Sequence, residues 1–169
     1  MKSAYDCVVM GGGPAGSTTA ALVAESGAKT LLVEREKFPR FHIGESLMPE
    51  TYWTFKRLGV LDRMRSSSFV KKMSVQFVGR SGRQSQPFFF GEHDPRECSQ
   101  TWQVERAKFD QMLFDNAAEK GAECHDETRV LEVVFDGERA TGVNIRTSAG
   151  AIEEIKRGSN GTGMIYSGP

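Results

Sequence analysis

The sequence predicts an α/β fold built around a parallel sheet, and three features of the chain indicate it. A short apolar run, Val8-Val9-Met10, ends in a glycine-rich turn at residues 11–16, which leads directly into an alanine-rich stretch. A second apolar run follows at residues 30–33, and a long amphipathic stretch follows at residues 106–120. Apolar runs that alternate with helical stretches are typical of units in which parallel strands are joined by helices.

The first of these units begins almost at the start of the chain. We expect residues 5–10 to form a buried strand and residues 14–26 to form a helix that Gly27 ends. We expect a second buried strand at residues 30–33, and Glu34 follows it directly. That carboxylate follows the turn at about the distance, roughly 20 residues, expected for a group that accepts hydrogen bonds from ribose hydroxyls.

The turn itself has the residues of an anion site. Gly11 allows a tight turn, Gly13 lets the backbone approach a pyrophosphate, and Gly16 lets the helix pack against the strand. Pro14 suits the first helical turn, where its missing N–H would have no intrahelical partner. Together with Ala15, these residues present free N–H groups at the positive end of a helix dipole, and the sequence therefore predicts a phosphate-binding turn.

Length, charge and cysteine content exclude several classes of protein. The 169 residues suit one domain, and 22 basic residues balance 22 acidic ones, which gives no support to a nucleic-acid partner or an anionic membrane surface. No apolar run reaches the ~18 residues of a membrane-spanning helix, and the first strand follows too closely for a signal peptide. Cys7, Cys98 and Cys124 form no Cys-x-x-Cys pair. We expect reduced thiols, no metal site and a cytoplasmic protein.

The middle of the chain changes from helical to strand patterns. We expect a helix at residues 49–58 and a short helical turn at residues 60–64. Alternating polar and apolar residues predict strands at residues 73–78 and 84–90, the second at an edge or bulge because it contains a proline. A further strand is expected at residues 100–104.

The last third of the chain predicts a small antiparallel sheet after the amphipathic helix. Residues 122–125 suit a short strand, and residues 128–135 and 140–147 suit a hairpin around Asp-Gly-Glu. Residues 151–156 could add a third strand. Residues 158–169 are glycine-rich without helix or strand periodicity, so we expect a flexible tail that is atypical of the fold.

Three stretches resemble FAD-dependent oxidoreductases with the glutathione-reductase type of Rossmann domain. More narrowly, the chain is similar to the group that contains flavin-dependent halogenases, geranylgeranyl reductases and aromatic-ring monooxygenases. The first stretch is the glycine turn together with residues 32–35. The second, residues 38–49, is similar to the Gly-Glu-Ser loop that halogenases place beside the flavin. The third, residues 104–113, is similar to the V-x-R-x-x-F-D-x-x-L helix start of the family.

This resemblance implies an FAD site. The glycine turn would bind the pyrophosphate, Glu34 would bind the adenosine ribose, and Arg35 belongs to the same matched stretch. Glu45 and Ser46 would contact the flavin, and Arg106 would reach the cofactor phosphates or the ribityl chain. The alternatives are a surface charge for Arg106 and a carboxylate near a helix N-cap for Glu45.

A further match concerns a lysine. Residues 69–77 are similar to the halogenase stretch F-x-x-K-x-G-x-x-F, whose lysine faces a channel from the flavin and handles hypohalous acid. Lys72 matches this lysine best and Lys71 is the adjacent candidate, whereas Ser74 stands where glycine is usual. The alternative is an exposed lysine that protects an edge strand from association.

The resemblance covers residues 5–156 and implies a domain organisation. We expect an FAD-binding domain at residues 1–157, with residues 66–104 as an inserted, substrate-side β segment. The G-W-x-W-x-I-P motif and the second flavin-binding segment of the family are absent from this sequence. The chain is therefore expected to correspond to the N-terminal part of such an enzyme.

Three functions remain open at this point. The first is an FAD-dependent oxidoreductase that uses reduced flavin and oxygen to halogenate or hydroxylate a small organic substrate, with a flavin reductase as a candidate partner. The second is a geranylgeranyl-reductase-like enzyme that reduces isoprenoid double bonds. The third is a non-catalytic fragment that binds adenine nucleotide weakly or not at all.

Overall fold

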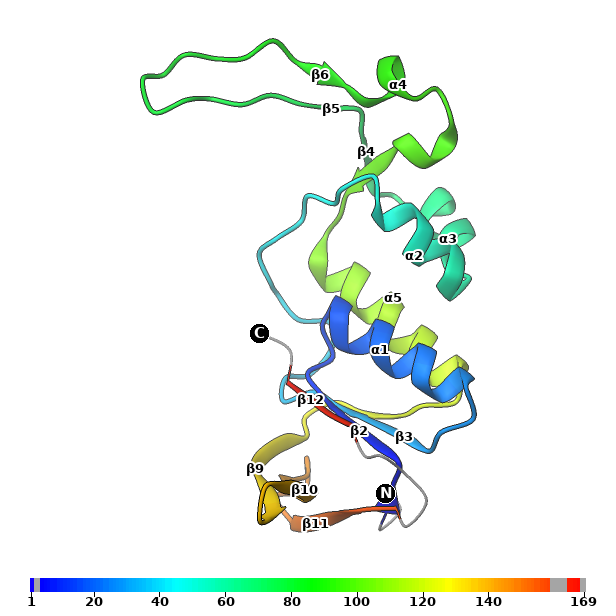
Figure 1. The fold of residues 1–169 in the computed structure, drawn as a ribbon, viewed down its shortest axis with the longest axis vertical. Coiled ribbons are helices and arrows are strands. Elements are labelled where there is room, and N and C mark those ends of the chain that lie inside the picture. The colour runs from blue at the N-terminus through cyan, green and yellow to red at the C-terminus, as the bar shows by residue number, and fades with distance from the viewer. Residues whose placement is uncertain (2–3, 159–163, 168–169) are drawn as a thin grey trace. The chain divides into compact units, whose positions relative to one another are not determined.

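The computed structural model describes residue 1, residues 4–158 and, for the backbone, residues 164–167. The chain forms two compact units, each described here by itself (Figure 1). The first unit joins residues 1–42 to residues 107–169, and the second comprises residues 43–106. The β segment predicted at residues 66–104 falls inside the second unit. The bounds 1–157 of the cofactor domain stay a prediction.

A parallel sheet forms the centre of the first unit. Its order is β12-β2-β3-β8, and every neighbouring pair is parallel. The strands are β2 (Cys7–Met10), β3 (Thr30–Val33), β8 (Glu123–His125) and β12 (Met164–Ser167), and α1 (Pro14–Glu25) connects β2 to β3. The predicted α/β fold with a parallel sheet is thereby confirmed.

A second sheet completes the first unit. Its order is β1-β11-β10-β9, with β1 (Ala4–Tyr5), β11 (Ile152–Arg157), β10 (Arg139–Arg146) and β9 (Arg129–Asp136). The predicted hairpin and its third strand are both present. The single N-terminal strand that the sequence predicts is instead divided at Asp6, whose backbone N–H and side chain both bond to the backbone of Lys29. The two halves therefore join different sheets.

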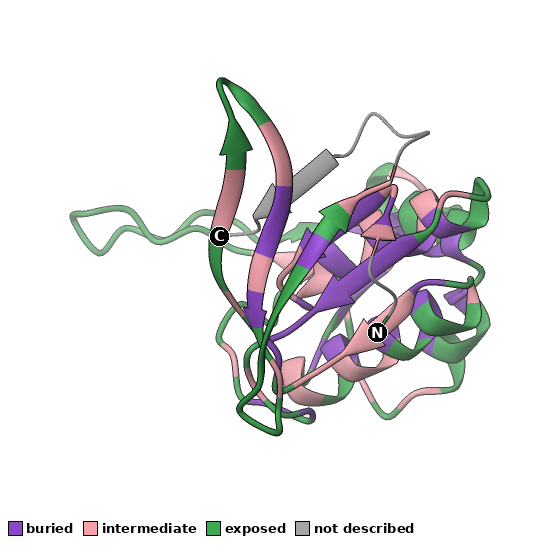
Figure 2. Cartoon of the chain, turned by 90° about the horizontal axis from the view of Figure 1, so that it is seen from below, coloured by how far each residue is buried: buried purple, intermediate pink, exposed green. Residues whose placement is uncertain are grey.

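The core of the first unit lies between these two sheets. All four residues of β3 are buried, as expected for a parallel strand that is covered on both faces. Helix α1 packs against β2 and β3, and the purple stretches in Figure 2 follow these buried strands. The core side chains that the two sheets share are Tyr5, Val8, Leu31, Val33, Val143, Ile145 and Ile155.

Helix α5 (Arg106–Glu119) presents a buried face that is more polar than predicted. Phe109, Leu113 and Ala117 are buried, whereas Met112 is only half-buried. Asp110 is fully buried on the same helix. An apolar pattern alone does not predict a buried carboxylate, because burial of a charge needs partners that lie elsewhere in the chain.

The second unit contains short elements. Its helices are α2 (Thr51–Leu58), α3 (Leu61–Ser66), α4 (Phe90–His93) and the 3-10 turn η1 (Glu97–Ser99). Its strand pairs are β4 (Val70–Lys72) with β7 (Thr101–Gln103), and β5 (Ser74–Val75) with β6 (Phe88–Phe89). Among the described residues, no helix is long and apolar enough to cross a membrane.

Two strand predictions in this unit were too long. Residues 76–87 extend beyond β5 and β6 as an exposed arm with one isolated bridge, Val78 to Gln84. Phe77 and Val78 are 69% and 65% exposed there, so the alternating pattern buries nothing. Pro87 also removes a backbone donor from the second strand.

The prediction for the C-terminal tail was wrong for four residues. Met164–Ser167 form β12, which pairs in parallel with β2 from Met164 opposite Cys7 to Ser167 opposite Met10. Pairing along an open strand edge uses backbone groups, so it does not require the side-chain periodicity that was absent from the sequence. The flexibility expected for the rest of this tail concerns residues outside those described, apart from Gly158.

Candidate cofactor site

The glycine turn after β2 has no space for a side chain at Gly16 but does have space at Gly13. Gly11 has φ +102°, a left-handed conformation that favours glycine, and its N–H bonds to the carbonyl of Val33 at 2.8 Å. A Cβ on Gly16 would lie 1.9 Å from the Gly11 carbonyl oxygen, so no side chain fits there. Among the described residues, a Cβ on Gly13 would meet Arg40 Nη2 alone, at 3.7 Å. The turn therefore leaves space at Gly13 for a ligand to approach the backbone.

The start of α1 adds an anion-binding end to this space. Gly13 is the N-cap and Pro14 occupies the first turn, and no side chain among the described residues caps the helix. Ser17 instead holds the turn from inside, because its Oγ donates to the Gly12 carbonyl at 3.1 Å. Ala15 is exposed beside Gly13. Uncapped N–H groups and the helix dipole favour a phosphate at this position.

Glu34 follows β3 and faces the turn, but as a buried group. Its Oε2 accepts from the Gly12 N–H at 2.8 Å, and its Oε1 accepts from the Glu36 N–H at 3.0 Å. Burial alone would raise the pKa of Glu34. The two backbone N–H groups and the Arg40 guanidinium outweigh that effect, so the pKa lies below its ordinary value.

Arg40 is a functional candidate that sequence reasoning missed. It is buried, and its Nη2 donates to Glu34 Oε2 while its Nη1 donates to Asp110 Oδ2, each at 3.1 Å. Both Arg40 and Asp110 lie inside the stretches that carry the family resemblance. An arginine in a polar segment nevertheless gives no sign of burial, because the two carboxylates that bury it come from distant positions.

Gly12 was also missed. A Cβ at this residue would lie 3.0 Å from Phe114 Cδ2, 3.1 Å from Phe38 Cε2 and 3.1 Å from Glu34 Cβ. The rings of Phe38 and Phe114 pack with centroids 4.6 Å apart. The turn is thus tightly packed at Gly12, whereas a Cβ at the half-buried Gly13 would meet no described atom closer than 3.7 Å.

In the second unit, the Gly-Glu-Ser loop is fixed by its backbone. The Glu45 carbonyl accepts from the Val104 N–H at 2.8 Å, and the Leu47 N–H donates to the Trp102 carbonyl at 3.1 Å. Glu45 and Ser46 are exposed. Glu50, not Glu45, is the N-cap of α2, so the alternative of a capping carboxylate finds no support.

Arg106 holds the same loop from the first residue of α5. Its Nη1 donates to the Ile43 carbonyl at 2.8 Å and lies 3.4 Å from the Gly44 carbonyl. Gly44 has φ +103°, and a Cβ on it would come 3.2 Å from Arg106 Nη1. The guanidinium therefore shapes the loop, and its expected contact with the cofactor stays a prediction. Arg35, in the first unit, is exposed.

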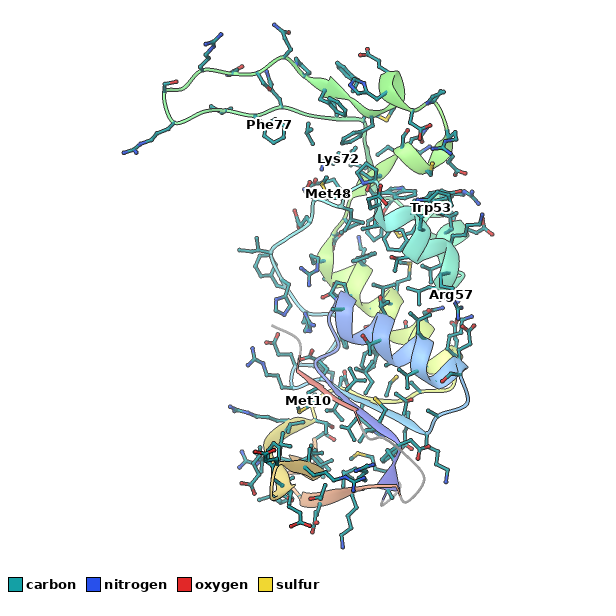
Figure 3. The ribbon with its side chains drawn as sticks, in the orientation of Figure 1. Met10, Met48, Trp53, Arg57, Lys72 and Phe77 are labelled. Carbon is teal, nitrogen blue, oxygen red and sulfur yellow. The ribbon has the colours of Figure 1, made fainter. Side chains whose placement is uncertain are left out.

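Lys72 lies at the end of β4 and contacts the Gly-Glu-Ser segment (Figure 3). Its Nζ donates to the Leu47 carbonyl at 3.1 Å and lies 5.7 Å from the centre of the Phe90 ring. Lys72 is half-buried, whereas Lys71 is exposed. The role of Lys72 in the chemistry therefore stays a prediction, as does its alternative as an edge-shielding lysine.

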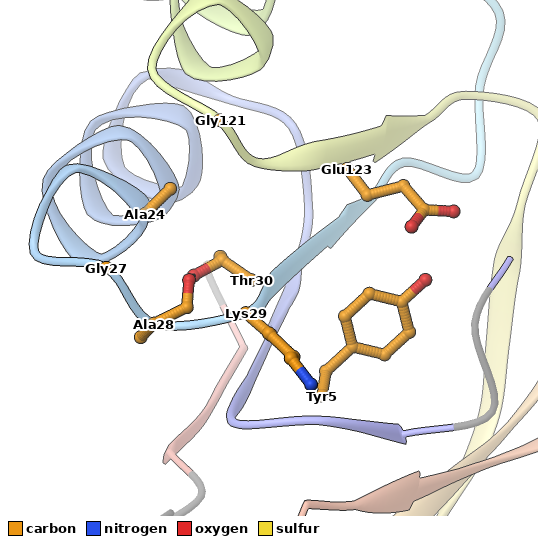
Figure 4. Close-up of a pocket in the computed structure, with 8 residues that line it drawn as sticks. All are labelled: Tyr5, Ala24, Gly27, Ala28, Lys29, Thr30, Gly121 and Glu123. Atoms are coloured by element: carbon orange, nitrogen blue, oxygen red, sulfur yellow. The ribbon is translucent and has the colours of Figure 1, made fainter.

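A pocket of about 200 Å³ lies elsewhere in the first unit (Figure 4). Lys29 and Thr30 line it at the start of β3, together with Tyr5, Gly27 and Glu123. Ligands of parallel sheets bind beyond the carboxyl ends of the strands, where the glycine turn and Glu34 lie. This pocket is at the opposite ends of the strands and is not the cofactor site.

Comparison with known proteins identifies the family. Residues 4–157 match the FAD binding domain family. The chain belongs to that family. The cofactor of this FAD-binding chain is FAD, as the resemblance implied, and the residues present fit it, because Gly13 leaves the backbone open to a pyrophosphate and α1 is uncapped.

Similar proteins include several halogenases. A 1H-pyrrole-2-carbonyl-[peptidyl-carrier protein] chlorinase from Pseudomonas fluorescens is 32% identical over 165 residues, which cover 88% of this chain and 37% of the chlorinase. The structure of the myxobacterial chondrochloren halogenase CndH matches with a TM-score of 0.85 and 37% identity, covering 96% of this chain and 39% of CndH. This FAD-binding chain thus spans less than two fifths of either halogenase.

A reductase-like structure is also similar. A geranylgeranyl bacteriochlorophyll reductase-like protein from Thermoplasma acidophilum matches with a TM-score of 0.68 and 26% identity, over 92% of this chain and 38% of that protein. Its similarity is lower by both measures than that of CndH. Both structures support the Rossmann-like FAD-binding fold.

Proposed function

We propose that the chain is the cofactor-binding part of an FAD-dependent oxidoreductase of the halogenase type. Such an enzyme would use reduced flavin and oxygen to halogenate a small organic substrate. When bound, reduced FAD supplies the electrons that activate oxygen, and the protein supplies binding and orientation. Monooxygenase-like hydroxylation of the substrate would use the same cofactor site.

In the first unit, the proposed contacts concern the ADP half of FAD. The backbone N–H groups at Gly13 and the start of α1 would bind the pyrophosphate. A carboxylate has about four acceptor positions, and Glu34 uses three of them on Gly12, Glu36 and Arg40. One position remains for a ribose hydroxyl, so Glu34 can serve the turn and the cofactor together.

In the second unit, the proposed contacts concern the flavin half. Glu45 and Ser46 lie on a loop whose backbone is fixed at both sides, which gives their exposed side chains a defined position. We place Arg106 and Arg35 in the cofactor site because both lie in stretches that resemble the family. Arg106 would act mainly by holding the loop.

The contact between Lys72 and Leu47 is the observation that carries halogenase chemistry. It joins the candidate lysine to the Gly-Glu-Ser segment, although 25 residues separate the two in sequence. A lysine ammonium can donate a hydrogen bond to hypohalous acid, or its free amine can form an adduct with it. The Leu47 carbonyl takes one of the three N–H groups of the ammonium, which leaves others to bind hypohalous acid.

The similar proteins agree with this proposal, since the chlorinase and CndH are both halogenases. We propose a flavin reductase as the partner that delivers reduced flavin. The substrate would be a small molecule with an electron-rich position. A cytoplasmic location stays a prediction.

Two measurements test the proposal. Purified protein should bind FAD, seen as a flavin absorbance band that remains after gel filtration. With chemically reduced FAD, oxygen and bromide, a full-length enzyme that includes this chain should then convert phenol to bromophenol. Reduction of geranylgeranyl diphosphate by reduced FAD, with no bromophenol formed, would favour a reductase, and absence of FAD binding would leave a non-catalytic fragment. Either result would overturn the proposal.

A further inference from the structure

Three buried charged side chains lie beneath the glycine turn in the first unit. The side chains of Arg40, Glu34 and Asp110 are only 6%, 7% and 0% exposed. Arg40 bridges the two carboxylates with one terminal nitrogen on each, at 3.1 Å. Buried charges are costly to keep unless each has a partner of opposite sign, and here Arg40 supplies that partner for both carboxylates.

The bridge continues into the turn without interruption. Asp110 accepts from Arg40, Arg40 donates to Glu34, and the same Glu34 oxygen accepts from the Gly12 N–H at 2.8 Å. This line of hydrogen bonds connects α5 to the turn after β2. Its last member, Gly12, directly precedes Gly13, where the turn is open.

We propose that Arg40 and Asp110 are positioning residues for the FAD pyrophosphate, because they hold the Glu34 carboxylate against the Gly12 N–H and so fix the shape of the open turn. This inference rests on the proposed FAD-binding function. It adds two residues, Arg40 and Asp110, that are joined to the turn through the Glu34 carboxylate, and it assigns Glu34 a role toward the protein as well as toward the ribose.

The geometry favours an arginine for this task. A guanidinium is planar and offers donors in a fixed fork, so it can hold two carboxylates at once, whereas a lysine ammonium is a single point on a flexible chain. The Phe38 ring lies 5.0 Å from Arg40 Cζ and restricts the guanidinium further. Arg40 Nη2 is also the nearest group to the Cβ position of Gly13, at 3.7 Å.

Removal of the bridge has a defined local consequence. Without the Asp110 charge, the guanidinium loses one of its two anchors and Glu34 is less restricted. The Gly12 N–H then spends more time without its acceptor, and the turn samples other shapes. Ligand binding would require the turn to be ordered again, which lowers affinity for any ligand that uses the pyrophosphate site.

The test uses two bridge variants and a control. Asp110→Asn keeps the shape of the side chain but removes its charge, and Arg40→Lys keeps the charge but removes the fork. Lys37→Met is the control, because Lys37 is an exposed cation of the same segment. Affinity for FAD and for ADP is measured by calorimetry, and hydrogen exchange at residues 11–13 is measured without ligand.

We expect both bridge variants to bind FAD and ADP about tenfold or more weakly, as for a lost charged hydrogen bond. Exchange at residues 11–13 should rise in both, while exchange in the second sheet stays unchanged. The Lys37→Met variant should match the wild type in every measurement. ADP is included because it carries the pyrophosphate without the flavin.

The outcomes separate this inference from the proposed function. Wild-type affinity in Asp110→Asn, with unchanged exchange at the turn, would overturn the positioning role and leave FAD binding intact. Lower affinity with faster exchange throughout the unit would also overturn it, because the bridge would then be merely structural. A wild-type protein that binds neither ligand would refute the proposed function. Hydrogen exchange at residues 11–13 would still show whether Arg40 and Asp110 order the turn, because it is measured without ligand.

Discussion

Two glycines of the turn after β2 differ in what surrounds them: Gly16 is packed against the protein, and Gly13 has space beside it. The first therefore matters for folding, and the second is expected to matter for binding. Gly16 is required by the protein, since its Cβ would lie 1.9 Å from a backbone oxygen. Gly13 is not required by the protein, since its Cβ would meet nothing closer than 3.7 Å and its φ of −72° suits any residue. Within the described part of the chain no contact calls for glycine at residue 13, whereas a bound pyrophosphate would.

Replacement of Gly13 should therefore abolish binding without unfolding the protein. We expect Gly13→Val to lose measurable FAD binding, because the side chain fills the space of the pyrophosphate. Its free energy of unfolding should stay within about 1 kcal/mol of the wild type. Gly91→Ala is the matched control, since Gly91 has open space around it and lies outside the site. Unchanged FAD affinity in Gly13→Val, measured by fluorescence titration, would contradict the assignment of the turn.

The sequence predicted the residues of this turn but not what lies beneath it. Gly11, Gly13 and Gly16 are recognisable because their spacing follows from the geometry of one local turn. Arg40 and Asp110 are not, because their pairing depends on tertiary contacts across 70 positions. The sequence also placed Glu34 near the turn, yet it could not show that the backbone of Gly12 takes one of its oxygens.

At the scale of elements, strand β4 pairs with β7 and carries Lys72, the candidate residue for halogenation chemistry. It pairs with β7 over three residues, and Lys72 at its end reaches the Leu47 carbonyl. This contact distinguishes Lys72 from Lys71, which precedes it on the strand and is exposed. The register of the strand pair thus selects one of two adjacent lysines.

In a full-length enzyme that includes this chain, we expect Lys72→Ala to lower the halogenation rate roughly a hundredfold or more, the size typical for loss of a group that stabilises developing charge. Reoxidation of reduced FAD should continue at the wild-type rate, because oxygen reacts with the flavin and not with the lysine. Lys56→Ala, an exposed lysine on α2, is the control. Bromophenol formation and flavin absorbance are followed in the same reaction. Halogenation that survives in Lys72→Ala but not in Lys71→Ala would move the role to the neighbouring lysine.

Elements were predictable from the sequence where they bury apolar residues and less so elsewhere. The positions of β2, β3 and α5 follow from apolar runs and helical spacing. The strands after Met73 were overextended, because an alternating pattern implies a buried face that the arm at residues 76–87 does not have. Strand β12 was missed because its sequence has no alternating pattern, although its backbone pairs with the edge of β2.

At the scale of the whole molecule, the buried charges make stability depend on pH. The pKa of Glu34 lies below its ordinary value of 4.5, so its charged form stabilises the folded state. That contribution is fully present above pH 4.5 and is lost as the pH falls through the lower folded-state pKa. Acidification should therefore lower the free energy of unfolding in this range.

The Glu34→Gln variant isolates this effect. We expect its free energy of unfolding to decline less steeply than that of the wild type below pH 4.5, because residue 34 no longer titrates. Other carboxylates with lowered pKa values, such as Asp94 at about 2, are present in both proteins and cancel in the difference. Urea unfolding at a series of pH values gives the two curves. Parallel curves would show that Glu34 has the same pKa in the folded and unfolded chains.

The discontinuity of the first unit has a consequence for synthesis on the ribosome. Strand β1 pairs with β11, so Ala4 can pair with Lys156 only after nearly the whole chain has been synthesised. The phosphate-binding turn emerges early, but its support from Asp110 and β8 emerges more than half a chain later. Residues 43–106, by contrast, form a unit that is continuous in sequence. During translation the nascent chain would thus expose an unfinished sheet for much of its elongation, which is the stage at which binding to chaperones is expected.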